Sequence, residues 1–385
     1  MKASHTFTWK SSSNLWILSL EHFPQLYDGA FVASKSSGEL LLYSLSTKGE
    51  PLGTVKAHQS TINAISKVDE HSLATAASGC IKVWDLRQKL SQAVLSLTSS
   101  KNPCFLSLAS KDNHVLTAGT ELSGADAEIH LWDLRNSDRI TRSFVDSHHD
   151  DVTALKFHPT LPYLMSGSTD GCVNIYNLNE PDEDEALHQV INFASVHLCH
   201  FVQPHRIGIL SHMETLGFWD LNNADYEVNS EAAPKDLGDV RSFWPDCEYV
   251  VDLYADYIVY GANSKLALSL MPFDSVKETF SINDSVIFPD AHGEEVVRHF
   301  CILPETNAAF TCGEDGLIKS WKLPLSFGVS TSGVVEVFEM DINESEVKVD
   351  KKRKDREQKE KKDKKKERKE KKEKKSKKDH IYKPY

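Results

Sequence analysis

A short pattern recurs along this sequence at a nearly constant interval. Three copies contain the triplet Trp-Asp-Leu, and four weaker copies end a strand in a similar way. The aligned positions, which are 41 to 52 residues apart, are 43, 84, 132, 176, 219, 269 and 321. An interval of roughly 20 to 50 residues is the signature of a repeat architecture, in which similar units stack on one another. We therefore expect the chain to fold as an array of seven related units.

The copy at 148–177 shows how one unit is built. Residues 152–157 alternate between apolar and polar side chains, which is typical of a half-buried strand. Residues 164–168 are a second predicted strand, Asp170 and Gly171 a tight hairpin, and residues 173–176 a third strand. Each unit is therefore predicted to be a small sheet of strands joined by hairpins.

This order of features resembles the WD-repeat family, whose propeller blades contain about 40 to 45 residues. The resemblance implies an all-β fold, a seven-bladed WD-repeat β-propeller of four-stranded sheets, in which radial closure protects the sheet edges. Within the family, the chain resembles the WD repeat-containing protein 89 type. That resemblance rests on residues 149–177, 182–187, 238–241 and 292–322, and it brings no known catalytic activity.

The units divide the chain into a propeller at 1–340 and a charged tail at 341–385. The predicted blades lie near 14–57, 58–100, 101–147, 148–193, 194–236, 237–284 and 285–340. The blade at 237–284 lacks Trp-Asp and is placed by strand alternation only. Two segments compete for the outer strand of the last blade, residues 5–9 and residues 334–338. We favour residues 5–9, because joining the two ends of the propeller stabilises the whole ring.

The family resemblance also implies a buried hydrogen-bond network in the fourth blade. His148, Ser168 and Asp170 would bond to one another and toward Tyr176, which stands where the family usually has Trp. A His and an Asp with such partners are structural, which makes a catalytic role for this pair the weaker interpretation. Other blades differ at the matching positions, with Ser78 and Met213 in place of the Asp and Gly313 in place of the Ser.

Charge separates the propeller from the tail. The chain has 44 Lys or Arg and 56 Asp or Glu, a net charge of −12, but residues 1–350 carry −24 and residues 351–385 carry +12. Within the tail, the segment 351–380 contains no Gly, Pro, aromatic or aliphatic residue and cannot form a core, so we predict that it is disordered or partly helical. Its lysines would contact RNA phosphates without reading sequence. It begins with a basic cluster of the nuclear-import type, Lys351, Lys352, Arg353 and Lys354.

Two further motifs suggest binding sites for partner proteins. Asp239 and Arg241, followed by Trp244, have the composition of an interface hot spot, although Trp244 could equally cap a blade. Arg87 and Arg135 end two Trp-Asp-x-Arg motifs in consecutive blades. These motifs are similar to those of receptors that dock on the adaptor of cullin-4 ubiquitin ligases, where the Arg makes the contact. The alternative is that each Arg simply projects from a strand end.

Patterns of catalytic and metal-binding residues are weak. The sequence has no Gly-rich phosphate loop between a strand and a helix and no Gly-x-Ser-x-Gly motif. Cys199 and His200 would point to opposite sides of a strand, which favours a core Cys over a ligand. The repeat already explains His148 within the group 148–151. We therefore predict no enzyme activity, no catalytic residue, no cofactor and no metal, and the longest apolar runs are too short to span a membrane.

Together these features predict a non-enzymatic scaffold that binds other proteins in the nucleus and nucleolus. Its acidic propeller would attract basic proteins, for which ribosome assembly is the process that we would name. We expect a monomer apart from these complexes. The alternatives are a substrate receptor of a cullin-4 ubiquitin ligase and a chromatin-binding propeller.

Overall fold

The computed structural model describes residues 1–10, 15–47, 49–136, 139–222, 234–303 and 306–324. The chain divides into two compact units, Met1–Ser330 and Thr331–Tyr385, and every described residue belongs to the first. The predicted tail, with its basic cluster at 351–354, lies outside the described residues. Among the helices of the described part, none is long and apolar enough to cross a membrane.

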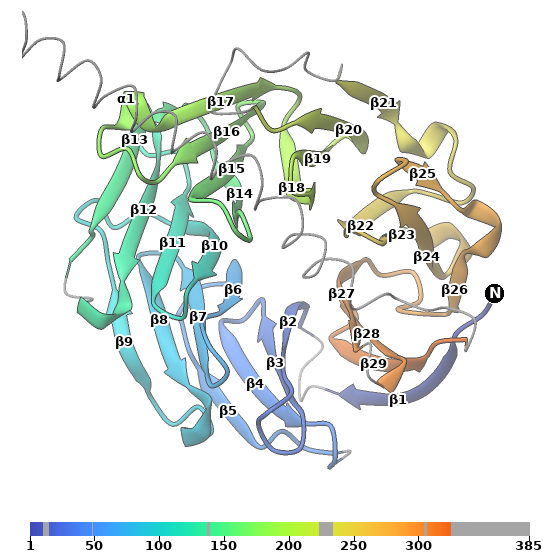
Figure 1. Ribbon diagram of the computed structural model, residues 1–385. Helices are drawn as coiled ribbons and strands as arrows, with labels where there is room; N and C mark the ends of the chain where they lie inside the picture. The colour runs from blue at the N-terminus through green and yellow to red at the C-terminus, as the bar shows by residue number, and fades with distance from the viewer. Residues whose placement is uncertain (11–14, 48, 137–138, 223–233, 304–305, 325–385) are drawn as a thin grey trace, which may run out of the picture. The chain divides into compact units, whose positions relative to one another are not determined.

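The first unit is a seven-bladed β-propeller, which confirms the predicted fold (Figure 1). The first strand of each blade contacts the first strands of neighbouring blades around the centre of the ring, so it is the inner strand. From the inner strand outward, the first four blades are β2 (Ile17–Phe23), β3 (Ala30–Lys35), β4 (Glu39–Ser44), β5 (Gly53–Lys56); β6 (Ala64–Lys67), β7 (Ser72–Ala77), β8 (Cys80–Asp85), β9 (Ala93–Leu97); β10 (Phe105–Lys111), β11 (Val115–Thr120), β12 (Ala127–Asp133), β13 (Arg142–His148); and β14 (Val152–Phe157), β15 (Tyr163–Ser168), β16 (Cys172–Asn177), β17 (Leu187–Asn192).

The single α-helix of the described residues, α1 (Glu183–Ala186), lies in the fourth blade between β16 and β17. Three blades remain. Their strands are β18 (Val196–Gln203), β19 (Arg206–Ser211), β20 (Thr215–Asp220), β21 (Lys235–Asp239); β22 (Tyr249–Leu253), β23 (Tyr257–Ala262), β24 (Ala267–Asp274), β25 (Thr279–Phe280), β26 (Val286–Pro289); and β27 (Val297–Leu303), β28 (Ala308–Gly313), β29 (Leu317–Lys322), β1 (Ser4–Lys10).

The core lies between the blades. Each of seven apolar clusters joins two neighbouring blades. Strand β3 shows why, because successive side chains point to opposite faces of a sheet. Its Ala30 and Val32 pack toward the second blade, whereas Phe31 and Ala33 pack toward the seventh. The middle strands are therefore apolar on both faces, while an outer strand such as β5 is only partly buried.

The N-terminal strand closes the ring. Strand β1 pairs with β29 in antiparallel register from Ser4 opposite Lys322 to Lys10 opposite Leu317. Trp9 is 3% exposed and packs with residues of the first and seventh blades, including Phe31 and Phe310. The prediction that residues 5–9 supply this strand is confirmed, and the rival segment 334–338 lies outside the described residues.

The sixth blade, placed from the sequence by strand alternation alone, has a divided outer strand. Strand β25 pairs with one end of β24 and β26 with the other. Because β26 ends at Pro289, this blade extends past the expected boundary at 284. Its edge is lengthened by the N-terminal segment, where the Ala3 amide donates to the Ile287 carbonyl at 2.9 Å.

The antiparallel order of the strands gives the propeller two distinct faces. We call the upper face the one formed by the hairpins between second and third strands and by the connections from each outer strand to the next inner strand. The lower face contains the connections from first to second strands and from third to outer strands. Loops on such faces carry most of the binding functions of rigid scaffolds.

Candidate functional site

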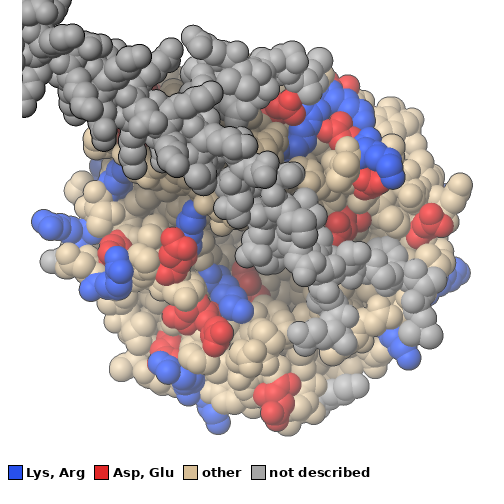
Figure 2. Space-filling view, viewed as in Figure 1, with Lys and Arg blue, Asp and Glu red and all other residues tan. Residues whose placement is uncertain are grey.

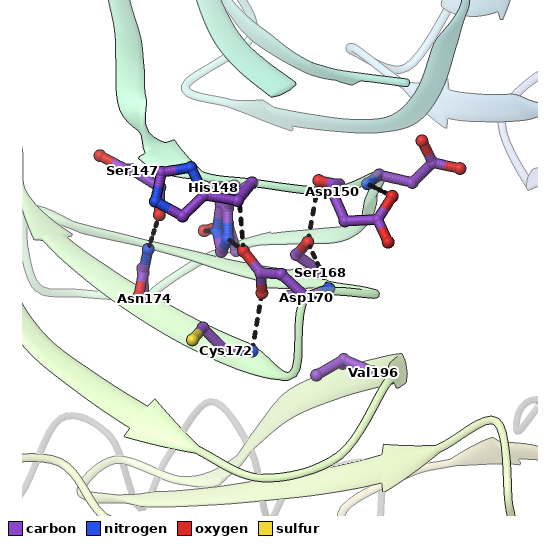
Figure 3. Close-up of polar contacts among 12 residues, drawn as sticks. Ser147, His148, Asp150, Ser168, Asp170, Cys172, Asn174 and Val196 are labelled. Atoms are coloured by element: carbon purple, nitrogen blue, oxygen red, sulfur yellow. Dashed lines mark hydrogen bonds and ion pairs between the residues drawn. The ribbon is translucent and has the colours of Figure 1, made fainter. Parts of the chain in front are cut away.

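The predicted network in the fourth blade forms, but with a different hydroxyl group (Figure 3). His148 Nδ1 lies 2.9 Å from Asp170 Oδ2, and its Nε2 lies 2.7 Å from the Ser166 hydroxyl. Ser168 is not the partner of His148. Its hydroxyl donates to the Asp150 carbonyl at 2.9 Å and accepts from the Asp170 amide at 3.1 Å. The assignment of Ser168 to the His is therefore corrected to Ser166.

The same arrangement recurs in the second and seventh blades. The Thr75 hydroxyl lies 2.7 Å from His58 Nε2 and accepts from Trp84 Nε1 at 3.1 Å. In the seventh blade the Thr311 hydroxyl lies 2.8 Å from His292 Nε2 and accepts from Trp321 Nε1 at 3.0 Å. The sequence pattern predicts this hydroxyl at position 313, where the chain has Gly313, but Thr311 supplies it two residues earlier.

The imidazole and aromatic rings of these networks are closed to solvent. His148 and Tyr176 are both 0% exposed. Tyr176 has no indole N–H, and its hydroxyl instead lies 3.3 Å from the amide nitrogen of Asn174. Burial acts to raise the pKa of Asp170, but hydrogen bonds from His148 and from the amides of Cys172 and His149 outweigh it and lower the pKa to about 2. The carboxylate is thus fixed in its ionised form by the fold.

The matching hairpin of the fifth blade is built differently. The Ser211 hydroxyl accepts from the amides of Met213 and Thr215, each at 3.1 Å, so the turn itself is kept. Met213 occupies the place of Asp170, and its side chain is 63% exposed. Glu214 follows with φ +60°, a left-handed conformation that costs a non-glycine residue roughly 1 to 2 kcal/mol. The fourth blade has Gly171 there.

Asp239 and Arg241 lie beside this hairpin. Arg241 Nε donates to Asp239 Oδ1 at 2.9 Å and Nη2 to Oδ2 at 2.7 Å, and Nη2 also lies 3.3 Å from the Met213 carbonyl. Strand β21 pairs with β20 so that Asp239 lies opposite Thr215. The backbone amide of Val240 donates to the Glu214 carbonyl at 3.0 Å. The two loops therefore form one continuous surface.

Trp244 is a core residue and not part of this surface. It is 3% exposed, and its ring centroid lies 5.6 Å from that of Tyr260 and 5.2 Å from that of Phe280. The interpretation that Trp244 caps the blade therefore fits the structure better than a direct contact with a partner. The preceding Phe243 is the exposed aromatic, at 44%. Both rings follow a short 3-10 helix at Val240–Ser242.

Arg87 and Arg135 do not join Arg241 in one site. Each follows the third strand of its blade and lies on the lower face, whereas Arg241 follows an outer strand and lies on the upper face. Their local geometry is nevertheless the same, since Nη2 lies 2.8 Å from Asp85 and 2.7 Å from Asp133. The two side chains are 63% and 67% exposed. Both are available to a partner on that face.

Large apolar side chains are exposed at several places on the upper face. Others lie on outer strands, and Val276 lies on the lower face. Those on the upper-face loops are 38% to 63% exposed and are Leu15, Trp16, Leu122, Met213, Phe243 and Leu266. Figure 2 shows Lys and Arg interspersed with Asp and Glu over the face that it displays.

Metal and cysteine ligation receive no support from the described part of the chain. Within it, no group of three or more His, Cys, Asp or Glu side chains is placed to hold a metal ion. Cys199 is buried in the core between the fourth and fifth blades, and His200 Nε2 lies 2.9 Å from Asp252 Oδ1. Cys199 thus packs in the core, whereas His200 makes a contact between the fifth and sixth blades.

Comparison with known proteins gives consistent results. The family model of the WD domain, G-beta repeat, matches residues 49–85 and 140–177. An uncharacterized WD repeat-containing protein from Saccharomyces cerevisiae is 39% identical over 319 residues, covering 80% of this chain and 79% of the yeast protein. A WD repeat-containing protein 89 homolog from Dictyostelium discoideum is 22% identical over 347 residues, 87% of this chain and 89% of its own length.

A further similarity covers less of the chain. THO complex subunit 6 from Homo sapiens is 26% identical over 174 residues, which are 41% of this chain and 50% of the human protein.

Proposed function

The chain belongs to the WD-repeat family, and from this premise we propose that it is a non-enzymatic scaffold whose upper face binds other proteins. The observation that carries the proposal is the set of exposed apolar side chains on the upper-face loops. Exposed apolar groups that lie close together on the loops of a rigid scaffold are typical of interaction sites.

We further propose that the protein acts in the nucleus and nucleolus, in ribosome assembly. The basic cluster at 351–354 supports import, and the charge of −24 over residues 1–350 favours basic partners. The similarity to a subunit of the THO complex supports a role within a multiprotein assembly. The Lys-rich tail would add salt-dependent contacts with RNA phosphates.

Affinity purification with mass spectrometry tests the process. Full-length protein and a variant lacking residues 351–385 are purified from cells at equal expression. Preribosomal proteins among the partners of the full-length protein support ribosome assembly, whereas ligase subunits or histones alone would reject it. Imaging the two proteins tests the tail, because unchanged nuclear accumulation without residues 351–385 would contradict its role in import.

Docking on the adaptor of a cullin-4 ubiquitin ligase is the second candidate. The observation that favours it is the identical, exposed geometry of Arg87 and Arg135 on neighbouring blades of the lower face. Replacing both residues with Ala should then abolish recovery of the adaptor. Arg241→Ala, on the upper face, is the matched control and should leave adaptor recovery unchanged. Adaptor recovery that survives the double substitution would reject this mode of docking.

A further inference from the structure

The hairpin of the fifth blade departs from its counterparts in a way that packing alone does not explain. The network Asp of the fourth and seventh blades is replaced by Met213, which turns outward and is 63% exposed. The next residue, Glu214, is held in a left-handed conformation that Gly171 and Gly316 adopt in those blades. Strained, non-glycine left-handed residues are concentrated at binding and catalytic sites.

The carboxylate of Glu214 has spare capacity to accept hydrogen bonds. Its Oε2 accepts from the Val250 amide at 3.0 Å. Among the described residues, Glu214 forms no ion pair, because the adjacent Arg241 is already engaged by both oxygens of Asp239. A carboxylate that is half buried and lacks a cation is stabilised strongly when one is supplied.

Apolar surface lies on both sides of these charges. Met213 is joined to Arg241 through its carbonyl, and Phe243 follows Arg241 by two residues, so the exposed Met and Phe side chains belong to the same rim. The loop continues with Asp246 and Glu248. With Glu214 and Asp239, these four carboxylates outnumber the two cations beside them, Arg241 and Lys265, so the rim favours a cationic partner and disfavours nucleic acid.

We propose that Met213, Glu214, Asp239, Arg241 and Phe243, which we call the blade-five rim, form a docking site for a basic segment of a partner protein. An apolar residue of that segment contacts Met213 and Phe243. A neighbouring Lys or Arg packs its aliphatic stem against Met213 and brings its charge to Glu214. This inference rests on the proposed function and specifies where, and for which chemistry, the scaffold binds.

Three fluorescein-labelled peptides of equal length test the site on the purified full-length chain. The first contains Lys, Leu and Ser, the second replaces Lys with Glu, and the third replaces Leu with Ser. Fluorescence anisotropy should show the tightest binding for the first. The variant Met213→Ser with Phe243→Ser should weaken that binding about tenfold, since losses above 1 kcal/mol are typical at interface anchors.

Leu122→Ser is the matched control, because Leu122 is an exposed upper-face residue on the third blade, 41% exposed. It should leave the affinity for the Lys-Leu peptide unchanged. Equal losses in the two variants, no loss in the Met213 and Phe243 variant, or a preference for the Glu-Leu peptide would each overturn the proposal.

The proposed ion pair with Glu214 should make the affinity for the peptide depend on pH. Burial raises the pKa of Glu214 to about 7, against the lowering effects of the Val250 amide and Arg241, and Asp239 adds to the increase. Because the cation binds the ionised carboxylate, affinity for the Lys-Leu peptide should rise between pH 6 and pH 8. Glu214→Gln should remove the rise. His212 is on the same hairpin, so His212→Asn is included and should preserve it.

The two levels of the hypothesis fail in different ways. If purification of the wild-type protein from cells recovers specific partners and the Met213 and Phe243 variant recovers the same set, the scaffold function stands and the blade-five rim is rejected. If the wild-type protein recovers no specific partner, the proposed function itself fails. A rise with pH that persists in Glu214→Gln rejects the ion pair with Glu214.

Discussion

At the scale of single residues, one hydroxyl group often satisfies two buried partners. Thr311 bonds to both His292 and Trp321, which are 3% and 1% exposed. Thr311→Val keeps the shape of the side chain but leaves both rings without this partner. We expect a loss of about 1 to 3 kcal/mol in the free energy of unfolding, measured by urea denaturation.

Thr169→Val is the matched control for this prediction. The Thr169 hydroxyl is buried and has no hydrogen-bond partner among the described residues. Its removal should therefore leave the stability unchanged or increase it slightly. A loss at Thr169 as large as that at Thr311 would mean that the networks do not carry the stability assigned to them.

Asp170 should make the stability of the folded protein depend on pH in the acidic range. Its pKa in the folded protein is lowered from 3.8 to about 2, so its contribution is present above pH 4 and is lost as the pH falls from about 4 to 2. Asp170→Asn should be less stable than the wild type at pH 6, and the difference should shrink toward pH 2. Thermal denaturation across this range measures it. A difference that is independent of pH would contradict the assignment.

Particular residues show what the sequence could predict at this scale. The pairing of His148 with Asp170 followed from the family pattern, but Ser166 and Ser168 point to the same side of β15, because side chains alternate with a period of two. Only the register of the strands distinguishes them. It sets Ser166 opposite Asn174, and Asn174 is two residues from Tyr176. Trp244 and Phe243 present the same problem. They are adjacent, and the sequence alone does not show which of the two rings is buried.

At the scale of elements, α1 protects the edge of the neighbouring blade. Its Glu183 carboxylate accepts from the amides of Val145 and Asp146, at 2.9 and 3.1 Å, and from the Ser147 hydroxyl at 2.6 Å. These donors belong to β13, an outer strand whose edge would otherwise be open to pairing. Acidic side chains at this position therefore have a structural role besides their charge.

Glu183→Ala should loosen that edge. We expect the amides of Val145 and Asp146 to exchange with deuterium at least about tenfold faster, because they lose a charge-assisted hydrogen bond. Asp184→Ala is the control, because Asp184 is in the same helix, is exposed and forms no hydrogen bond with β13 among the described residues. Protection that is equal in the two variants would show that α1 does not stabilise the strand.

The sixth blade shows how far strand alternation alone can predict an element. Its middle strands β23 and β24 are apolar and lie where alternation placed them. The division of the outer strand into β25 and β26 could not be read from the sequence, because both segments are short and gain their pairing from β24 and from the N-terminal residues. Edge pairing of this kind depends on tertiary contacts.

At the scale of the whole propeller, ring closure depends on a few side chains of β1. Trp9 fills the core between the seventh and first blades, with ring centroids 5.2 Å from Phe31 and 6.0 Å from Phe310. Trp9→Ala should lower the free energy of unfolding by about 3 to 5 kcal/mol, measured by urea denaturation. Lys10→Ala, at an exposed position of the same strand, should change little. Similar losses in both variants would mean that closure does not rest on this packing.

The pairing of β1 with β29 also sets an order of events during synthesis. Strand β1 leaves the ribosome more than 300 residues ahead of β29, the strand with which it pairs. At roughly 5 to 20 residues per second, it waits for about 15 to 60 s with Phe7 and Trp9 uncovered. A nascent chain of this kind is exposed to aggregation for that interval. Its yield in cells should therefore depend on chaperones that bind short apolar segments near the N-terminus.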